Sequence, residues 1–130
     1  LYLGLKDYQQ LYLIKKFIKS KYKIKIISIK TVRYKKTLAY SSRNKLLSGK
    51  EIDVACIIAK KMLNFYYLIK SNFNNRKKLN LLKKDILKYK IKLDYLEIRN
   101  KDNLSKKYNK NNFKIFIAYH LNKVRLIDNF

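Results

Sequence analysis

The sequence predicts an α/β chain in two parts, a strand–helix–strand unit over residues 1–44 and a small α+β unit with an antiparallel sheet over residues 45–130. In the first part the apolar residues form a short run, then recur at helical spacing, then form a short Ile-rich run, which is the pattern of a βαβ unit. In the second part they recur at helical spacing twice and then alternate in three segments. The chain is 48% hydrophobic over 130 residues, enough for a real core.

Each element of the first part has its own signal. The run LYLG (1–4) predicts the end of a buried strand, with Gly4 permitting a tight exit. Asp7 is expected to cap the next helix, with Gln10 in the capping-box position. The run IKIISI (24–29) is apolar on both faces, as in a parallel strand covered by helices. Ligands of such sheets bind beyond the carboxyl ends of the strands, where GLKD and YSSRN follow.

In the second part, Ser48 and Glu51 have the S-x-x-E spacing of a capping box and predict the start of a long helix that NFNN breaks. A shorter amphipathic helix is expected over 79–89, and the polar link that follows the first strand predicts a turn or a short helix. Strands are predicted over 92–98, 113–121 and 124–130, with Asn122-Lys123 joining the last two as a hairpin.

The charge is strongly positive, with 33 basic and 8 acidic side chains and a formal net charge of +25. Such a balance raises nucleic acid or an anionic membrane surface as a partner. The lysines are spread along the whole chain, however, and they rise together with Asn, Ile and Tyr while Pro and Trp are absent. An AT-rich coding sequence produces this profile in any protein. We therefore expect no specific nucleic acid and no membrane partner, and keep a basic nucleic-acid-binding module as an alternative function.

Other signals point to the cytoplasm. Cys56 is the single cysteine, lies among apolar residues and predicts a buried, inert thiol in a reducing compartment. His120 is the single histidine and has no acidic or cysteine neighbour at ligand spacing, so no metal site is predicted. The longest uncharged apolar run is too short to span a bilayer. Because the chain opens with Leu1 inside an apolar run, we expect it to be a fragment cut at or inside a strand.

Polar donors gather at the two predicted loops. Lys6 and Asp7 lie where a strand passes into a helix, a place where backbone N–H groups favour an anion, and Gln10 lies one turn further. The segment 41–43 (SSR) adds two hydroxyls and a guanidinium fork. Taken singly, these residues are typical of caps, turns and solvated charge. Together they predict a site that stabilises charge on a phosphate.

The runs LGLKDYQQLYLIKKFI, TVR, LAYSSRNKLLS and VRLIDN resemble the pantothenate synthetases (pantoate–β-alanine ligases). That family has a pattern close to G-x-K-D-x-Q-Q-L, then T-V-R-E-x-D-G-L-A-M-S-S-R-N-x-x-L-S, and finally R-L-I-D-N. The resemblance covers all 130 residues but only the C-terminal half of the family's chain. It implies the end of a Rossmann-like domain of the class I synthetase type over 1–44 and a C-terminal lid over 45–130.

The resemblance also implies an activity, a step of pantothenate biosynthesis toward coenzyme A. Pantoate and Mg²⁺-bound ATP give pantoyl-adenylate and pyrophosphate, and β-alanine then gives pantothenate and AMP, in an enzyme that is a homodimer when complete. Gln10 matches the pantoate-binding glutamine. The implied contacts to the reacting phosphate are Lys6, Ser41, Ser42 and Arg43. The implied ATP-binding residues are Gly4, Leu5, Lys6, Asp7, Val32, Tyr40, Ser41, Ser42 and Arg43.

The sequence departs from the family's pattern at two places and lacks part of its site. Tyr34, Lys36 and Thr37 stand where the family has Glu and Asp-Gly, and Tyr40 replaces a Met or Leu beside the adenine. The family's ATP-gripping histidines and first pantoate glutamine belong to its N-terminal half. We therefore expect this chain alone to be incomplete as an enzyme, and an inactive remnant of the ligase is a further alternative.

Overall fold

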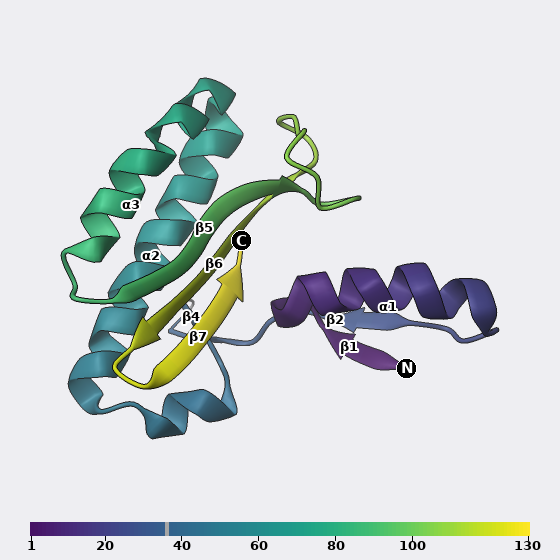
Figure 1. Cartoon of the computed structure of the whole chain (residues 1–130), viewed down its shortest axis with the longest axis horizontal. Helices are drawn as coiled ribbons and strands as arrows, with labels where there is room; N and C mark the ends of the chain where they lie inside the picture. Colours follow the sequence, from purple (N-terminus) through teal and green to yellow (C-terminus); the bar gives the residue numbers. More distant parts are fainter. Residues whose placement is uncertain (36) are drawn as a thin grey trace.

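The first part of the chain is a strand–helix–strand unit, as predicted. The computed structural model describes residues 1–35 and 37–130, so Lys36 lies outside the described residues. The unit consists of β1 (Tyr2–Gly4), the 3₁₀ turn η1 (Leu5–Asp7), α1 (Tyr8–Lys21) and β2 (Ile27–Ile29). β1 and β2 pair in parallel, and α1 runs alongside them (Figure 1). This geometry puts the carboxyl ends of both strands at one edge, from which η1 leaves.

The second strand of this unit is shorter and less buried than predicted. Only the end of the expected 24–29 strand pairs with β1, and Ile24 and Ile29 are 41% and 50% exposed. An apolar, β-branched run favours a strand but does not by itself supply neighbours that cover it. The chain does turn directly after Gly4, as expected, but this turn does not require a glycine. The φ of Gly4 is −73°, and an added Cβ would meet nothing within 4 Å.

The capping box expected at the start of α1 is also wrong. Asp7 makes no side-chain cap for the helix, and its Oδ1 lies 3.5 Å from Lys6 Nζ instead. The 3₁₀ turn η1 runs directly into α1, so the helix has no separate first turn for Asp7 to cap. The carboxylate and the lysine are therefore left on the surface that faces the second loop.

A short hairpin that the sequence did not predict connects the two parts. β3 (Arg33–Tyr34) pairs antiparallel with β4 (Leu38–Ala39), and Lys35 adopts a left-handed φ of 44° in the turn. The β4 residues are 6% and 3% exposed, because they pack against the core of the second part. This anchor fixes the start of the 41–43 segment, which continues into the 3₁₀ turn η2 (Ser42–Leu46).

The second part has the predicted two helices and three strands. The elements are α2 (Gly49–Ser71), the 3₁₀ turn η3 (Phe73–Lys78), α3 (Leu79–Leu87), β5 (Lys92–Asn100), β6 (Phe113–Leu121) and β7 (Val124–Asn129). The sheet order is β5-β6-β7, antiparallel throughout, and the β6–β7 hairpin is confirmed. The capping box is confirmed as well: Ser48 Oγ accepts from Glu51 N at 3.3 Å, and Glu51 Oε2 accepts from Ser48 N at 2.7 Å.

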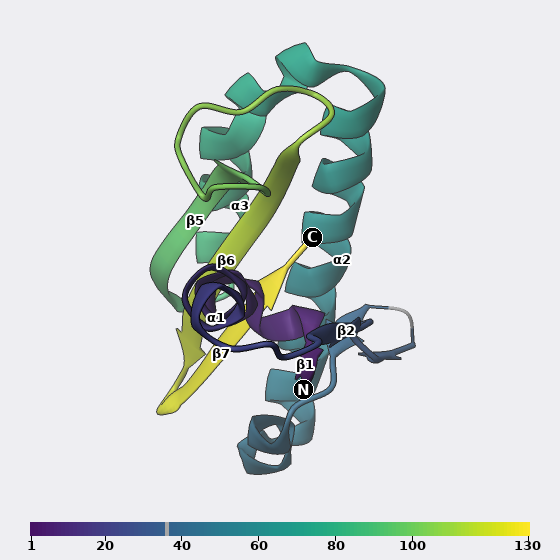
Figure 2. The ribbon, with the colours of Figure 1, turned by 90° about the vertical axis from the view of Figure 1, so that its right-hand side faces the viewer.

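The core lies between the sheet and the two helices of the second part (Figures 1 and 2). Fully buried members include Ile58 and Met62 on α2 and Ile115 on β6. The opposite face of β6 is covered by the beginning of α1, where the ring of Tyr8 lies 6.0 Å from that of Phe116. Only the first turn of α1 lies against this face, and the rest of the helix extends away from the sheet, so that Figure 2 shows it end-on.

Two smaller predictions can be compared with the fold. Cys56 is free and only partly buried, at the edge of the core rather than inside it. The polar link between β5 and β6 forms turns and no helix in the part of the chain that the structure describes. Among the described helices, none is both long and apolar enough to cross a membrane.

Two adjacent isoleucines on α2 test where the core lies. Ile58 is 1% exposed and Ile57 is 40% exposed. We expect Ile58→Ala to lower the free energy of unfolding by about 2–5 kcal/mol, because it removes buried methyl groups and leaves a cavity. Ile57→Ala is the matched control and should cost far less. Chemical denaturation measures both, and equal losses would contradict this placement of α2.

Candidate functional site

The structure brings the predicted polar residues of the two loops to one hollow of about 410 Å³. One wall comes from η1 and the first turn of α1, and the other comes from the segment that follows β4. Of the residues predicted for the site, six line this hollow: Lys6, Asp7, Gln10, Ser41, Ser42 and Arg43. Two further lining residues were not predicted, Gln9 from the same turn of α1 and Ile127 from β7.

The other predicted residues lie beside this hollow and do not line it. Tyr40 lines a second hollow of about 410 Å³, which shares Ser41 with the first. Val32 is 66% exposed, and its carbonyl accepts a hydrogen bond from Tyr40 N at 2.9 Å. Gly4 and Leu5 form the strand exit that leads to the site without lining either hollow. The predicted residues thus lie in or beside two adjacent hollows that share Ser41.

The departures from the family pattern are concentrated at the second hollow. Tyr34 and Tyr40 both line it, and their rings meet edge-on at 6.1 Å. Thr37 closes the β3–β4 hairpin with hydrogen bonds from its N and Oγ1 to Tyr34 O at 2.9 and 3.1 Å. The left-handed conformation in this hairpin is at Lys35, and Lys36 lies outside the described residues. Two of the departures therefore form one aromatic pair.

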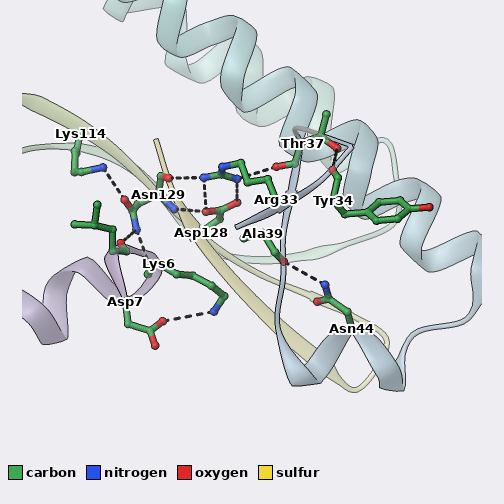
Figure 3. A network of polar contacts seen from close by, with 11 residues as sticks. Lys6, Asp7, Arg33, Tyr34, Thr37, Ala39, Asn44, Lys114, Asp128 and Asn129 are labelled. Atoms are coloured by element: carbon green, nitrogen blue, oxygen red, sulfur yellow. Dashed lines mark hydrogen bonds and ion pairs between the residues drawn. The ribbon is translucent and has the colours of Figure 1, made fainter. Parts of the chain in front are cut away.

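A bidentate ion pair between Arg33 and Asp128 holds the β3–β4 hairpin to the sheet (Figure 3). Arg33 Nη1 and Nη2 donate to Asp128 Oδ2 and Oδ1 at 2.7 and 3.0 Å. The same guanidinium donates to the carbonyls of Thr37 and Asn129 at 2.8 and 3.0 Å and lies 4.6 Å over the ring of Phe130. Burial raises the pKa of the Asp128 carboxyl, and the hydrogen bonds from Arg33 oppose this rise. The pair joins the 33–39 hairpin rigidly to the end of β7.

The next residue on β7 holds the lysine-bearing turn. Asn129 Nδ2 donates to the carbonyls of Leu5 and Lys6 at 2.8 and 2.7 Å (Figure 3). Its Oδ1 accepts from Lys114 Nζ at 2.7 Å, so the amide orientation is set from the other side. The end of β7 therefore positions both walls of the first hollow, one through Asp128 and the other through Asn129.

The 41–43 segment is shaped by local hydrogen bonds. Ser41 Oγ accepts from Arg43 N at 3.3 Å, which caps η2. Asn44 Nδ2 donates to Ala39 O at 3.1 Å and so ties the end of the segment back to β4. The Oδ1 of Asn44 is buried and has no hydrogen-bond partner among the described residues. Asn44 thus fixes both ends of the segment that carries the two serines and the arginine.

The first hollow can neutralise an anion. Lys6 and Arg43 bring two positive charges, Asp7 is the single carboxylate among its lining residues, and the serines and glutamines add neutral donors. A guanidinium and hydroxyls at fixed positions suit phosphate oxygens. Side-chain amides can orient an uncharged or carboxylate-bearing substrate beside them.

The described residues contain no group of three His, Cys, Asp or Glu side chains that could hold a metal ion. His120 Nε2 lies 3.2 Å from Asp94 Oδ2, which also accepts from Arg125 Nε at 2.7 Å. That hydrogen bond from Arg125 is the main reason that the pKa of Asp94 is lowered. Sequence reasoning missed Asp94 as a neighbour of His120 because the two are joined only by strand pairing.

Comparison with known proteins agrees with this geometry. The family model described as pantoate-beta-alanine ligase matches residues 1–130. The chain belongs to the pantoate-beta-alanine ligase family. Pantothenate synthetases of Francisella tularensis subsp. mediasiatica and subsp. novicida are 39% and 38% identical over 131 residues, which cover 100% of this chain and 42% of each relative. The chain therefore spans less than half the length of these relatives.

Solved structures of the family show the same fold. A pantothenate synthetase from Thermus thermophilus has a TM-score of 0.83 at 25% identity, and the match covers 99% of this chain and 48% of that one. A pantoate-beta-alanine ligase from Francisella tularensis, solved with beta-gamma ATP and beta-alanine, has a TM-score of 0.73 at 38% identity. This match covers 100% of this chain and 42% of that one. The predicted fold class, the end of a Rossmann-like domain followed by a small α+β unit, is confirmed by these neighbours.

The pH dependence of stability tests the burial of Lys114, the lysine that orients Asn129. Burial, together with the nearby positive charges of Arg33 and Lys101, lowers the pKa of Lys114 to about 8. Between about pH 8 and the ordinary pKa of lysine, the Lys114 amine is therefore protonated in the unfolded chain and neutral in the folded one. The free energy of unfolding rises with pH over this range, because the folded protein no longer has to bury a charged amine. Relative to Lys114→Met, the parent chain should gain up to about 3 kcal/mol of stability between pH 7 and pH 10.

Denaturation at several pH values measures this difference. The control is Lys84→Met, a change at a lysine on α3 that lies away from the site. The same pH dependence in both variants would contradict the burial of Lys114.

Proposed function

We propose that this chain supplies the phosphate-facing wall of a pantoate–β-alanine ligase, which condenses pantoate with β-alanine at the expense of ATP and releases AMP and pyrophosphate. The observation that carries the proposal is the single hollow in which Lys6, Gln10 and the 41–43 segment meet. These residues belong to the two motifs that characterise the family. The Francisella structure was solved with an ATP compound and beta-alanine, which supports the same substrates for this chain.

The chemistry assigned to the hollow has two steps. A carboxylate oxygen of pantoate attacks the α-phosphorus of ATP, and the bond from that phosphorus to the pyrophosphate oxygen breaks. The amine of β-alanine then attacks the activated carbonyl carbon, the bond to the AMP oxygen breaks, and the amine loses a proton. Both steps place negative charge on phosphate oxygens, so donors fixed beside them lower the barrier.

Five of the lining residues have a role in the phosphate and pantoate chemistry of this proposal. Lys6 and Arg43 neutralise the growing charge on the α-phosphate, and Ser41 and Ser42 donate hydrogen bonds to it. Gln10 orients pantoate through its side-chain amide. Mg²⁺ enters with ATP as part of the substrate, bound mainly through phosphate oxygens and water.

The second hollow is assigned to the adenosine end of ATP. Tyr40 lines it and accounts for the adenine side, and Tyr40 N donates to the Val32 carbonyl, so these two ATP-binding candidates lie opposite each other just beyond the ends of β3 and β4. Gly4, Leu5 and Asp7 complete the ATP contacts from the strand exit. The Tyr34–Tyr40 pair offers an aromatic surface where the family has a smaller residue.

The setting of this chemistry is part of the proposal. We place the reaction in the cytoplasm, in keeping with a free thiol at Cys56. We keep the division near residue 44, between the ATP- and pantoate-binding part and the lid, and a homodimer as the complete enzyme. The family membership of the chain supports these assignments.

A chimeric enzyme tests the proposal. Residues 1–130 of this chain would replace the matching 131 residues of the Francisella tularensis enzyme, and AMP formation from ATP, pantoate and β-alanine would be measured. The proposal expects turnover that depends on all three substrates. A folded chimera that binds ATP but makes no AMP would favour the alternative of an inactive remnant.

Within that chimera, Arg43 should act mainly in the transition state. We expect Arg43→Ala to lower kcat and kcat/KM equally, by about 10²–10³-fold, as for the loss of one fixed donor to a developing oxyanion. The matched control is Arg76→Ala, whose guanidinium lies over Phe73, outside both hollows. Steady-state kinetics separates the two roles: a raised KM with unchanged kcat would assign Arg43 to ATP binding alone.

A further inference from the structure

A third hollow, lined mainly by lysines, lies on the far side of Asn129 from the candidate site. It has a volume of about 570 Å³, within the range of small-molecule sites. Lys70 from the end of α2, Lys114 from β6 and two lysines of the β5–β6 link line it, over the rings of Tyr66 and Phe113. The lysines of the link are Lys101 and Lys110. It shares no lining residue with the hollow at Lys6.

The side chains that line this hollow carry unbalanced positive charge, because four of them are lysines and none is a carboxylate. The acidic side chain that acts on Lys114 is Asp128, which already accepts two hydrogen bonds from Arg33. Crowded, partly desolvated ammonium groups are costly unless an anion pairs with them.

An AT-rich coding sequence explains lysines scattered over the surface, but it does not explain why four of them line one hollow. Lys114 is partly buried, and its amine donates to Asn129 Oδ1 at 2.7 Å, so it is held in place. Lys70, whose amine lies 5.9 Å over the ring of Tyr66, lines the same hollow from the end of α2. One partly buried, hydrogen-bonded lysine and three exposed lysines around one hollow are suited to a compact polyanion.

We propose that this hollow is a second anion site, which binds a diphosphate group between Lys70, Lys110 and Lys114. The group comes either as inorganic diphosphate or as the diphosphate of a nucleotide. One side chain connects this hollow to the candidate site, because Lys114 donates to Asn129, which donates to the Lys6 carbonyl at 2.7 Å. The binding itself does not depend on the proposed ligase activity.

The test follows the side-chain amines of the 130-residue chain by NMR with isotope-labelled lysine. Titration with inorganic pyrophosphate at physiological salt should raise the pKa of Lys114 from about 8 toward its ordinary value. A parallel titration with ADP separates the two sources: tighter binding of ADP assigns the site to a nucleotide, and equal or weaker binding assigns it to inorganic diphosphate.

Two double variants decide whether the hollow is responsible. Lys70→Gln with Lys110→Gln should weaken pyrophosphate binding about a hundredfold, since two charge-assisted contacts are lost and each corresponds to about a tenfold change. The matched control is Lys88→Gln with Lys90→Gln, which removes the same charge from exposed positions outside the hollow. All four lysines are exposed, so the fold is retained. Equal weakening in both variants, or no change at Lys114, would overturn the proposal.

Discussion

The buried ion pair between Arg33 and Asp128 is the interaction on which the arrangement of the site depends. Their side chains are 18% and 8% exposed, and they join residues that are 95 positions apart. Removing one partner of such a pair costs about 3–5 kcal/mol, because the other charge stays buried and uncompensated. Without the pair the β3–β4 hairpin keeps only the packing of Leu38 and Ala39 against the core, so the 41–43 segment that follows β4 is held less firmly.

The end of β7 therefore acts as a common base for two loops that come from different parts of the chain. Asp128 holds the hairpin before the serine–arginine segment, and Asn129 holds the turn with Lys6. A site that stabilises a transition state needs its donors at fixed relative positions before the substrate arrives. Two neighbouring buried residues at the end of one strand supply this rigidity more simply than two separate anchors would.

The second part of the chain was predictable from the sequence because its elements follow from local patterns. The helical spacing, the Ser48–Glu51 cap and the alternating strands each depend on nearby residues, and the structure has all of them. In the first part the family motifs, rather than periodicity, identified the residues of the site. Lys6, Gln10 and the 41–43 segment do meet in one hollow, although their roles stay predictions.

What could not be predicted depends on contacts between distant residues. The amide of Asn129 reaches carbonyls 123 and 124 positions away, and VRLIDN carries no local sign of that role. The same is true of the pair His120 and Asp94, 26 positions apart. The exposure of β2 and the missing cap at Asp7 also reflect tertiary packing, which propensity does not encode.

Amide hydrogen exchange across residues 5–10 tests whether the end of β7 holds the Lys6 turn through Asn129. Asn129→Ala removes both donors to this turn, so exchange there should become faster while the interior of α2 keeps its protection. Asn80→Ala, at an exposed position of α3, is the matched control and should change neither region. Unchanged protection of residues 5–10 in Asn129→Ala, or the same loss of protection throughout α2, would contradict the account.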